Sequence, residues 1–82
     1  MISRSIILRN QKETIDFVCM VERYPYAVDI SEGHRTMDAK SILGMLAMGF
    51  NCVMKMDVYS DNADDLLEAV SKYMCNGFEK AV

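Results

Sequence analysis

Residues Asp38–Gly49, with the sequence Asp-Ala-Lys-Ser-Ile-Leu-Gly-Met-Leu-Ala-Met-Gly, predict a short helix that is more apolar than one buried face requires. Asp38 is expected to cap the first turn, and Gly49 to end the helix as a left-handed residue. One set of apolar residues has the spacing of a core face: Ile42, Met45 and Leu46. Three others widen the apolar surface: Leu43, Ala47 and Met48. A second element or a protein partner must therefore cover that side.

The length and charge of the chain restrict the class of protein. Its 82 residues, of which 51% are hydrophobic and 26% charged, predict one globular domain over residues 1–82. The net charge of −3 argues against nucleic acid and anionic membranes as partners, because both need a basic surface. Neither a membrane-spanning run nor a signal peptide is recognisable, so the cytoplasm is the expected location.

The cysteines do not form a pattern that binds metal or builds a disulfide framework. Cys19, Cys52 and Cys75 are odd in number and widely spaced, without a Cys-x-x-Cys pair. They are expected to be reduced and to pack as small buried hydrophobic residues. No metal and no cofactor are expected.

The rest of the chain reads as a regular alternation of strands and helices. Asn10, followed by Glu13, and Asn62, followed by Asp65, are expected to form capping boxes at two helix starts. Gly33 supplies the positive φ of a hairpin turn. The expected strands are residues 2–8, 26–31, 35–37 and 52–59, and the expected helices are residues 13–23, 38–49 and 63–75, with Gly77 as a stop after the last helix. The order β-α-β-β-α-β-α predicts an α+β fold in which three helices cover one face of a four-stranded antiparallel sheet.

Alternating side chains indicate which face of the sheet is buried. Five residues of two strands are expected to face the helices: Val28, Ile30, Met54, Met56 and Val58. Lys55 and Asp57 are expected on the opposite face. In the first helix, the expected inner line contains Ile15, Val18, Cys19 and Glu22, with Phe17 and Val21 beside it.

Residues Lys40–Gly49 resemble the Lys-Ser-Ile-Met-Gly-Val-Met-Ser-Leu-Gly segment of HPr, the small phosphocarrier of the bacterial sugar phosphotransferase system. Residues 22–41 overlay the corresponding part of HPr without a gap, including Tyr24, Val28, Gly33 and Thr36. The resemblance implies an open-faced β-sandwich with strand order 1-4-2-3. It also implies a phosphocarrier or a regulator rather than an enzyme.

The phosphate-carrying site of the family is degenerate in this chain. HPr carries its phosphate on a histidine in a His-x-Arg-Pro turn at the start of the first helix, where this chain has Asn10, Gln11 and Lys12. An amide cannot form a phosphorylated intermediate, and Lys12 can replace the arginine only as a point charge. Catabolite-repression HPr of bacilli also has glutamine in place of the histidine. The single imidazole, His34, is expected to be a surface residue of the hairpin turn.

Two further functional expectations follow from the resemblance. Ser41 matches the regulatory phosphorylation site of Gram-positive HPr, where phosphate would lie beside the free N–H groups of the second helix. The alternative is that Ser41 only caps this helix. Ile42, Leu43 and Leu46 match the positions through which HPr docks its partners. Leu43 and Met48 are expected to be exposed and to form a partner-binding apolar patch with Ile42, Leu46 or Phe50.

Three hypotheses on function remain open. The leading one is an HPr-like protein that binds another protein, such as a phosphotransferase-system enzyme, HPr kinase or a transcription regulator, through the second helix. The second is a divergent phosphocarrier that takes phosphate from phosphoenolpyruvate through the upstream enzyme. The third is a module of the same fold that forms a homodimer.

Overall fold

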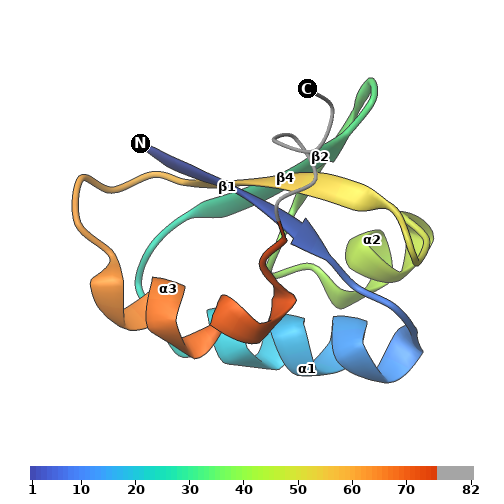
Figure 1. Cartoon of the computed structure of the whole chain (residues 1–82), viewed down its shortest axis with the longest axis horizontal. Helices are drawn as coiled ribbons and strands as arrows, with labels where there is room; N and C mark the ends of the chain where they lie inside the picture. Colours follow the sequence, from blue (N-terminus) through green and yellow to red (C-terminus); the bar gives the residue numbers. More distant parts are fainter. Residues whose placement is uncertain (76–82) are drawn as a thin grey trace.

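The computed structural model describes residues 1–75. Its elements follow the predicted order, and a single-turn 3₁₀ helix, η1, comes after α3. The bounds are β1 Ile2–Ile7, α1 Gln11–Val21, β2 Val28–Glu32, β3 Arg35–Asp38, α2 Ile42–Ala47, β4 Val53–Val58, α3 Asp64–Ala69 and η1 Ser71–Tyr73. The strands form one antiparallel sheet in the order β1-β4-β2-β3, and the helices lie on one side of it (Figure 1). The predicted α+β fold is confirmed.

The central strand β4 sets the register of the sheet. On one side Met54 lies opposite Ile6 of β1, and on the other side Met56 lies opposite Ile30 of β2. Side chains of a strand alternate between faces, so this register places the apolar residues of three strands together. All five residues predicted to face the helices are buried: Val28, Ile30, Met54, Met56 and Val58.

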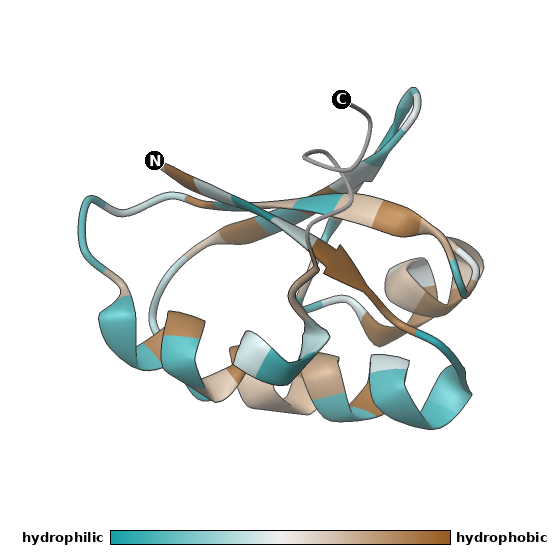
Figure 2. Cartoon of the chain, in the orientation of Figure 1, coloured by the Kyte–Doolittle hydropathy of each residue, from teal (hydrophilic) through white to brown (hydrophobic). Residues whose placement is uncertain are grey.

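The inner sides of the helices complete the core. Hydrophilic residues are frequent along α1 and α3, whereas α2 is drawn mostly in pale and brown tones (Figure 2). The buried face of α1 consists of Thr14, Phe17, Val18 and Val21. The predicted line through Ile15, Cys19 and Glu22 is wrong, because Cys19 lies one residue beyond Val18, about 100° round the helix, and is exposed. Cys52 and Cys75 are half-buried and, like Cys19, free, so the expectation that the three cysteines pack as buried residues is wrong.

The start of α2 differs from the prediction. Asp38 does not cap the helix, because it pairs with Asp29 as the last residue of β3, and Ala39 still donates its N–H to the carbonyl of Val28. The chain leaves the sheet only after Ala39. Ser41 is the N-cap residue instead. Gly49 follows the C-cap with a φ of +94°, which confirms the predicted left-handed stop.

The last helical segment is shorter than predicted. The N-cap of α3 is Ala63, without a side-chain hydrogen bond, and the predicted Asn62–Asp65 capping box is absent. Asp65 instead accepts a hydrogen bond from the hydroxyl of Tyr26, which raises the pKa of that phenol. After η1 the chain becomes extended, because Met74 bridges to Ile6 at the free edge of β1. The predicted stop at Gly77 lies outside the described residues.

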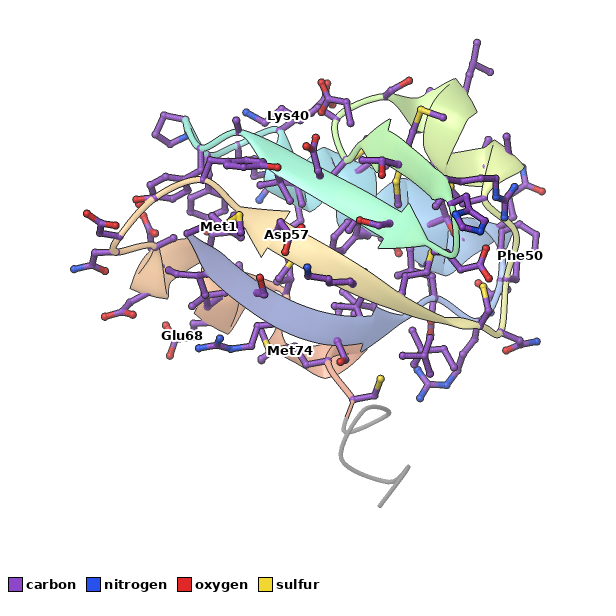
Figure 3. All side chains as sticks on the ribbon, turned by 90° about the horizontal axis from the view of Figure 1, so that it is seen from above. Met1, Lys40, Phe50, Asp57, Glu68 and Met74 are labelled. Atoms are coloured by element: carbon purple, nitrogen blue, oxygen red, sulfur yellow. The ribbon has the colours of Figure 1, made fainter. Side chains whose placement is uncertain are left out.

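Lys55 and Asp57 lie on the open face of the sheet, as expected, but Asp57 is only 8% exposed. Ser3, directly opposite on β1, donates its hydroxyl to the Asp57 carboxylate at 2.6 Å, and the Lys55 ammonium lies 3.6 Å from it. The Asp57 carboxylate, although buried, therefore has a hydrogen-bond donor and a cation beside it. Figure 3 shows Asp57 near the middle of the open face.

Gly44 allows α2 to pack closely against β3. A Cβ atom at this position would overlap the side chain of Met37. Gly44→Ala should therefore lower the free energy of unfolding by about 1–3 kcal/mol, the usual cost of overpacking. Chemical denaturation of the purified protein measures the change.

Met37→Ala is the matched background for this test. With the long side chain removed, alanine at position 44 should be neutral or stabilise the helix by up to about 1 kcal/mol, since alanine is a better helix former than glycine. Equal effects of Gly44→Ala in both backgrounds would contradict the proposed contact.

Candidate functional site

The start of α1 is a capped helix end. The side-chain oxygen of Asn10 accepts the backbone N–H of Glu13 at 2.9 Å, as predicted for the N-cap. The carboxylate of Glu13 accepts the N–H of Arg9, one residue earlier than in a standard capping box. Asn10 therefore stabilises the helix by satisfying a donor that lacks an intrahelical partner.

A hollow of about 310 Å³ lies at this helix end and is lined by residues of both α1 and η1. It is lined by Asn10, Lys12, Glu13, Asp16, Lys72 and Tyr73. Lys12 lies 2.8 Å from the carboxylate of Asp16, and this hydrogen bond raises the pKa of the ammonium group. Two carboxylates therefore accompany the two lysines, which makes the hollow unfavourable for a phosphoryl group.

The other candidate residue for phosphoryl transfer lies elsewhere. His34 is exposed in the turn between β2 and β3, as predicted, and does not line the hollow. Gln11 is also exposed, at the first position of α1. The described residues thus place no imidazole at the start of α1.

Several exposed apolar residues lie on α2 or just after it. The side chain of Leu43 is 80% exposed, Ile42 is 38% exposed and Phe50 is 41% exposed, while Leu46 is half-buried. We call these four residues the α2 surface. The expectation that Met48 is exposed is wrong: it is only 3% exposed, because it packs into the core beside Met45.

Ser41 serves as the N-cap of α2. Its hydroxyl oxygen accepts the N–H of Gly44 at 3.3 Å, and the residue is half-buried. The neighbouring Lys40 donates its ammonium group to the carbonyl of Tyr24, in the turn that follows α1. This contact joins the start of α2 to that turn.

Residues 1–75 contain no cluster of three or more His, Cys, Asp or Glu side chains suited to a metal ion. Within the same residues, none of the helices has the length and apolar character needed to cross a bilayer.

The comparison with solved structures identifies the fold. No family model and no curated protein sequence matches the chain. Among solved structures, HPr-C-His from Thermoanaerobacter tengcongensis is similar with a TM-score of 0.74 and 19% identity, over 88% of this chain and 89% of that one. The phosphocarrier protein HPr from Bacillus anthracis has a TM-score of 0.72 and 20% identity, over 90% and 96% of the two chains.

A third solved structure, the histidine-containing phosphocarrier protein of a mycoplasma, has a TM-score of 0.72 and 14% identity, over 87% of this chain and 89% of that one. The strand order β1-β4-β2-β3 with helices on one face is the arrangement that the resemblance in sequence implied. The chain therefore has the fold of the HPr phosphocarrier proteins.

Some residues near these sites were not predicted from the sequence. Lys72 and Tyr73 meet the start of α1 only because η1 packs back against it. Arg35 reaches the end of α2 from β3. Neither contact can be recognised from the spacing of residues along the chain, since both join elements that are separate in the sequence.

The capping role of Asn10 predicts a defined loss of stability. Asn10→Ala should lower the free energy of unfolding by about 1 kcal/mol, because the N–H of Glu13 loses its acceptor. The matched control is Gln11→Ala, which removes a neighbouring exposed amide and should change stability by less than about 0.5 kcal/mol. Equal losses in the two variants, measured by urea denaturation, would rule out this role.

Proposed function

We propose that this protein binds another protein through the α2 surface and does not carry phosphate on histidine. The observation that supports this most directly is Leu43, an aliphatic side chain that is 80% exposed on a six-residue helix. Ile42 and Phe50 add exposed apolar area around it. Because apolar patches on soluble proteins often mark interaction sites, we expect a partner protein to bury the α2 surface.

Burial of these apolar side chains by a partner would contribute substantially to the free energy of binding. Burying an exposed leucine or phenylalanine side chain contributes about 1.5–3 kcal/mol. A small number of buried anchors usually dominates the affinity of an interface. Leu43 is the expected anchor, with Phe50 and Ile42 around it.

The HPr fold defines the proposed class of partner. By resemblance, it is a protein of the phosphotransferase system, HPr kinase or a transcription regulator that binds HPr. The proposed location is the cytoplasm. No enzymatic activity is proposed for the chain itself, and a second copy of the chain is an alternative occupant of the α2 surface.

We also propose Ser41 as a site of regulatory phosphorylation. Its oxygen already accepts the N–H of Gly44, so a phosphate there would keep an acceptor in place while adding nearly two negative charges. This charge would lie next to Ile42 and Leu43 and would change the surface that a partner meets. In the alternative interpretation, Ser41 is only the helix cap.

Incubation with phosphoenolpyruvate and the general phosphotransferase enzyme should leave the intact mass unchanged. The physical reason is that Asn10 and Gln11 cannot take a phosphoryl group and Lys12 is paired with Asp16. A stoichiometric, acid-labile gain of about 80 Da, the mass of one phosphoryl group, would contradict the proposal. Loss of this gain in His34→Ala would support the divergent-phosphocarrier alternative.

Incubation with ATP and HPr kinase tests Ser41 in the same way. A single acid-stable gain of about 80 Da that is absent in Ser41→Ala is the expected result. An unmodified protein would leave Ser41 as a helix cap and remove the regulatory proposal.

Leu43→Asp should weaken partner binding at least about tenfold and change the unfolding midpoint little, because the side chain is exposed in the free protein. Calorimetric titration with each candidate partner and sedimentation of the free chain measure these effects. Val53→Asp is the control, since Val53 is 40% exposed but lies on β4 outside the α2 surface. Unfolding of Leu43→Asp, or equal binding by all variants, would oppose the docking proposal.

A further inference from the structure

One guanidinium group connects the β2–β3 hairpin to the end of α2. Arg35, the first residue of β3, donates from Nη1 to the carbonyl of Ala47 at 3.2 Å and from Nη2 to the carbonyl of Met48 at 2.9 Å. The same Nη2 also contacts the carboxylate of Glu32 at 3.1 Å. Glu32 and Arg35 are paired across the hairpin, so this carboxylate holds the guanidinium in place.

The end of α2 depends on donors from outside the helix. Its last turn carries no basic residue; the N–H of Met48 donates to the carbonyl of Met45, whereas the carbonyls of Ala47 and Met48 accept from Arg35, outside the helix. A cation at this position is favourable because the helix dipole is negative there. Arg35 supplies both the donors and the charge.

The segment after α2 is held at two points. Arg35 binds the Met48 carbonyl on one side of Phe50, and on the other side the N–H of Asn51 donates to the carbonyl of Leu8 at 2.8 Å. Between these points Gly49 and Asn51 have positive φ angles of 94° and 60°. Phe50 thus lies on a tightly turned segment, at the end of the sheet where β4 begins (Figure 3).

We infer that Arg35 is a positioning residue of the α2 surface: its guanidinium fixes the last turn of α2 and so holds Phe50 where a partner can bury it. This inference rests on the proposed docking function. A preordered side chain costs less entropy on binding than one that must be immobilised. Arg35 therefore contributes to affinity without itself forming the apolar contact.

Arginine is required here rather than any cation. Its planar fork reaches two carbonyl oxygens and a carboxylate at once, whereas a lysine ammonium is a single point charge on a flexible stem. Arg35→Lys should consequently keep the charge and lose most of the positioning.

The first test uses the free full-length protein. Hydrogen exchange followed by NMR should show the amides of Met48 and Asn51 exchanging about tenfold faster in Arg35→Ala, because local opening at the end of α2 becomes easier. Arg35→Lys should give most of the same increase, and the amide of Ile6 should be unaffected. The matched control is Arg4→Ala, which removes an exposed arginine whose side-chain hydrogen bond within residues 1–75 is to the carbonyl of the adjacent Ser3. Unchanged exchange at Met48 and Asn51 would overturn the inference.

The second test is a double-mutant cycle with a partner, for which the general phosphotransferase enzyme is the first probe. Arg35→Ala should weaken binding about tenfold when Phe50 is present and have little effect in a Phe50→Ala background. The unfolding midpoint should stay close to that of the unmodified protein in every variant. Additive losses in the cycle would show that Arg35 does not act through Phe50 and would overturn the inference.

Different results would contradict the docking proposal and the positioning role of Arg35. Binding that is insensitive to Leu43→Asp opposes docking at the α2 surface, whatever Arg35 does. Unchanged exchange at the end of α2 in Arg35→Ala removes the positioning role while leaving docking intact.

Discussion

The register of β4 between β1 and β2 is the constraint on which the rest of the structure depends. Met54 opposite Ile6 and Met56 opposite Ile30 place the apolar side chains of the sheet on one face. A shift by one residue would bring Lys55 to the helices and expose both methionines. Only in the observed register can α1 and α3 bury their apolar sides against the sheet, and only then does β3 lie where α2 can pack on it.

The place of α2 in this arrangement explains its exposed apolar side. Met45 and Met48 fill the core and Gly44 lies against Met37, so the opposite side of so short a helix must face outward. Leu43 occupies that side. The start of α1, by contrast, is occupied by groups that satisfy one another, with Asn10 bonded to Glu13 and Lys12 to Asp16. The start of α1 and the α2 surface, which lie at the same end of the molecule (Figure 1), thus differ: the α2 surface is apolar and exposed, whereas the start of α1 has a closed set of polar contacts.

The sequence predicted the features that depend on alternation and on local turn chemistry. The four strands, the hairpin at Gly33 and the cap at Asn10 all follow from residues close together in the chain. The errors have a common cause, which is competition from tertiary contacts. Asp38 stays in the sheet rather than capping α2, and Asp65 binds Tyr26 instead of completing a cap. Met48 is buried because it follows Met45 by three residues and shares its inner face. The role of Arg35 was not predictable, because it joins a strand to a helix end that only the fold brings together.

Chemical-shift mapping by NMR tests the central claim most directly. The ¹⁵N-labelled protein would be titrated with the general phosphotransferase enzyme, HPr kinase and an HPr-binding transcription regulator in turn. Docking through the α2 surface predicts that the amides of Ile42, Leu43, Leu46 and Phe50 shift or broaden first, with little change at Asn10, Lys12 and Asp16. Perturbation centred on Asn10, Lys12 and Asp16, with Leu43 unaffected, would contradict the account and indicate that partners bind at the start of α1.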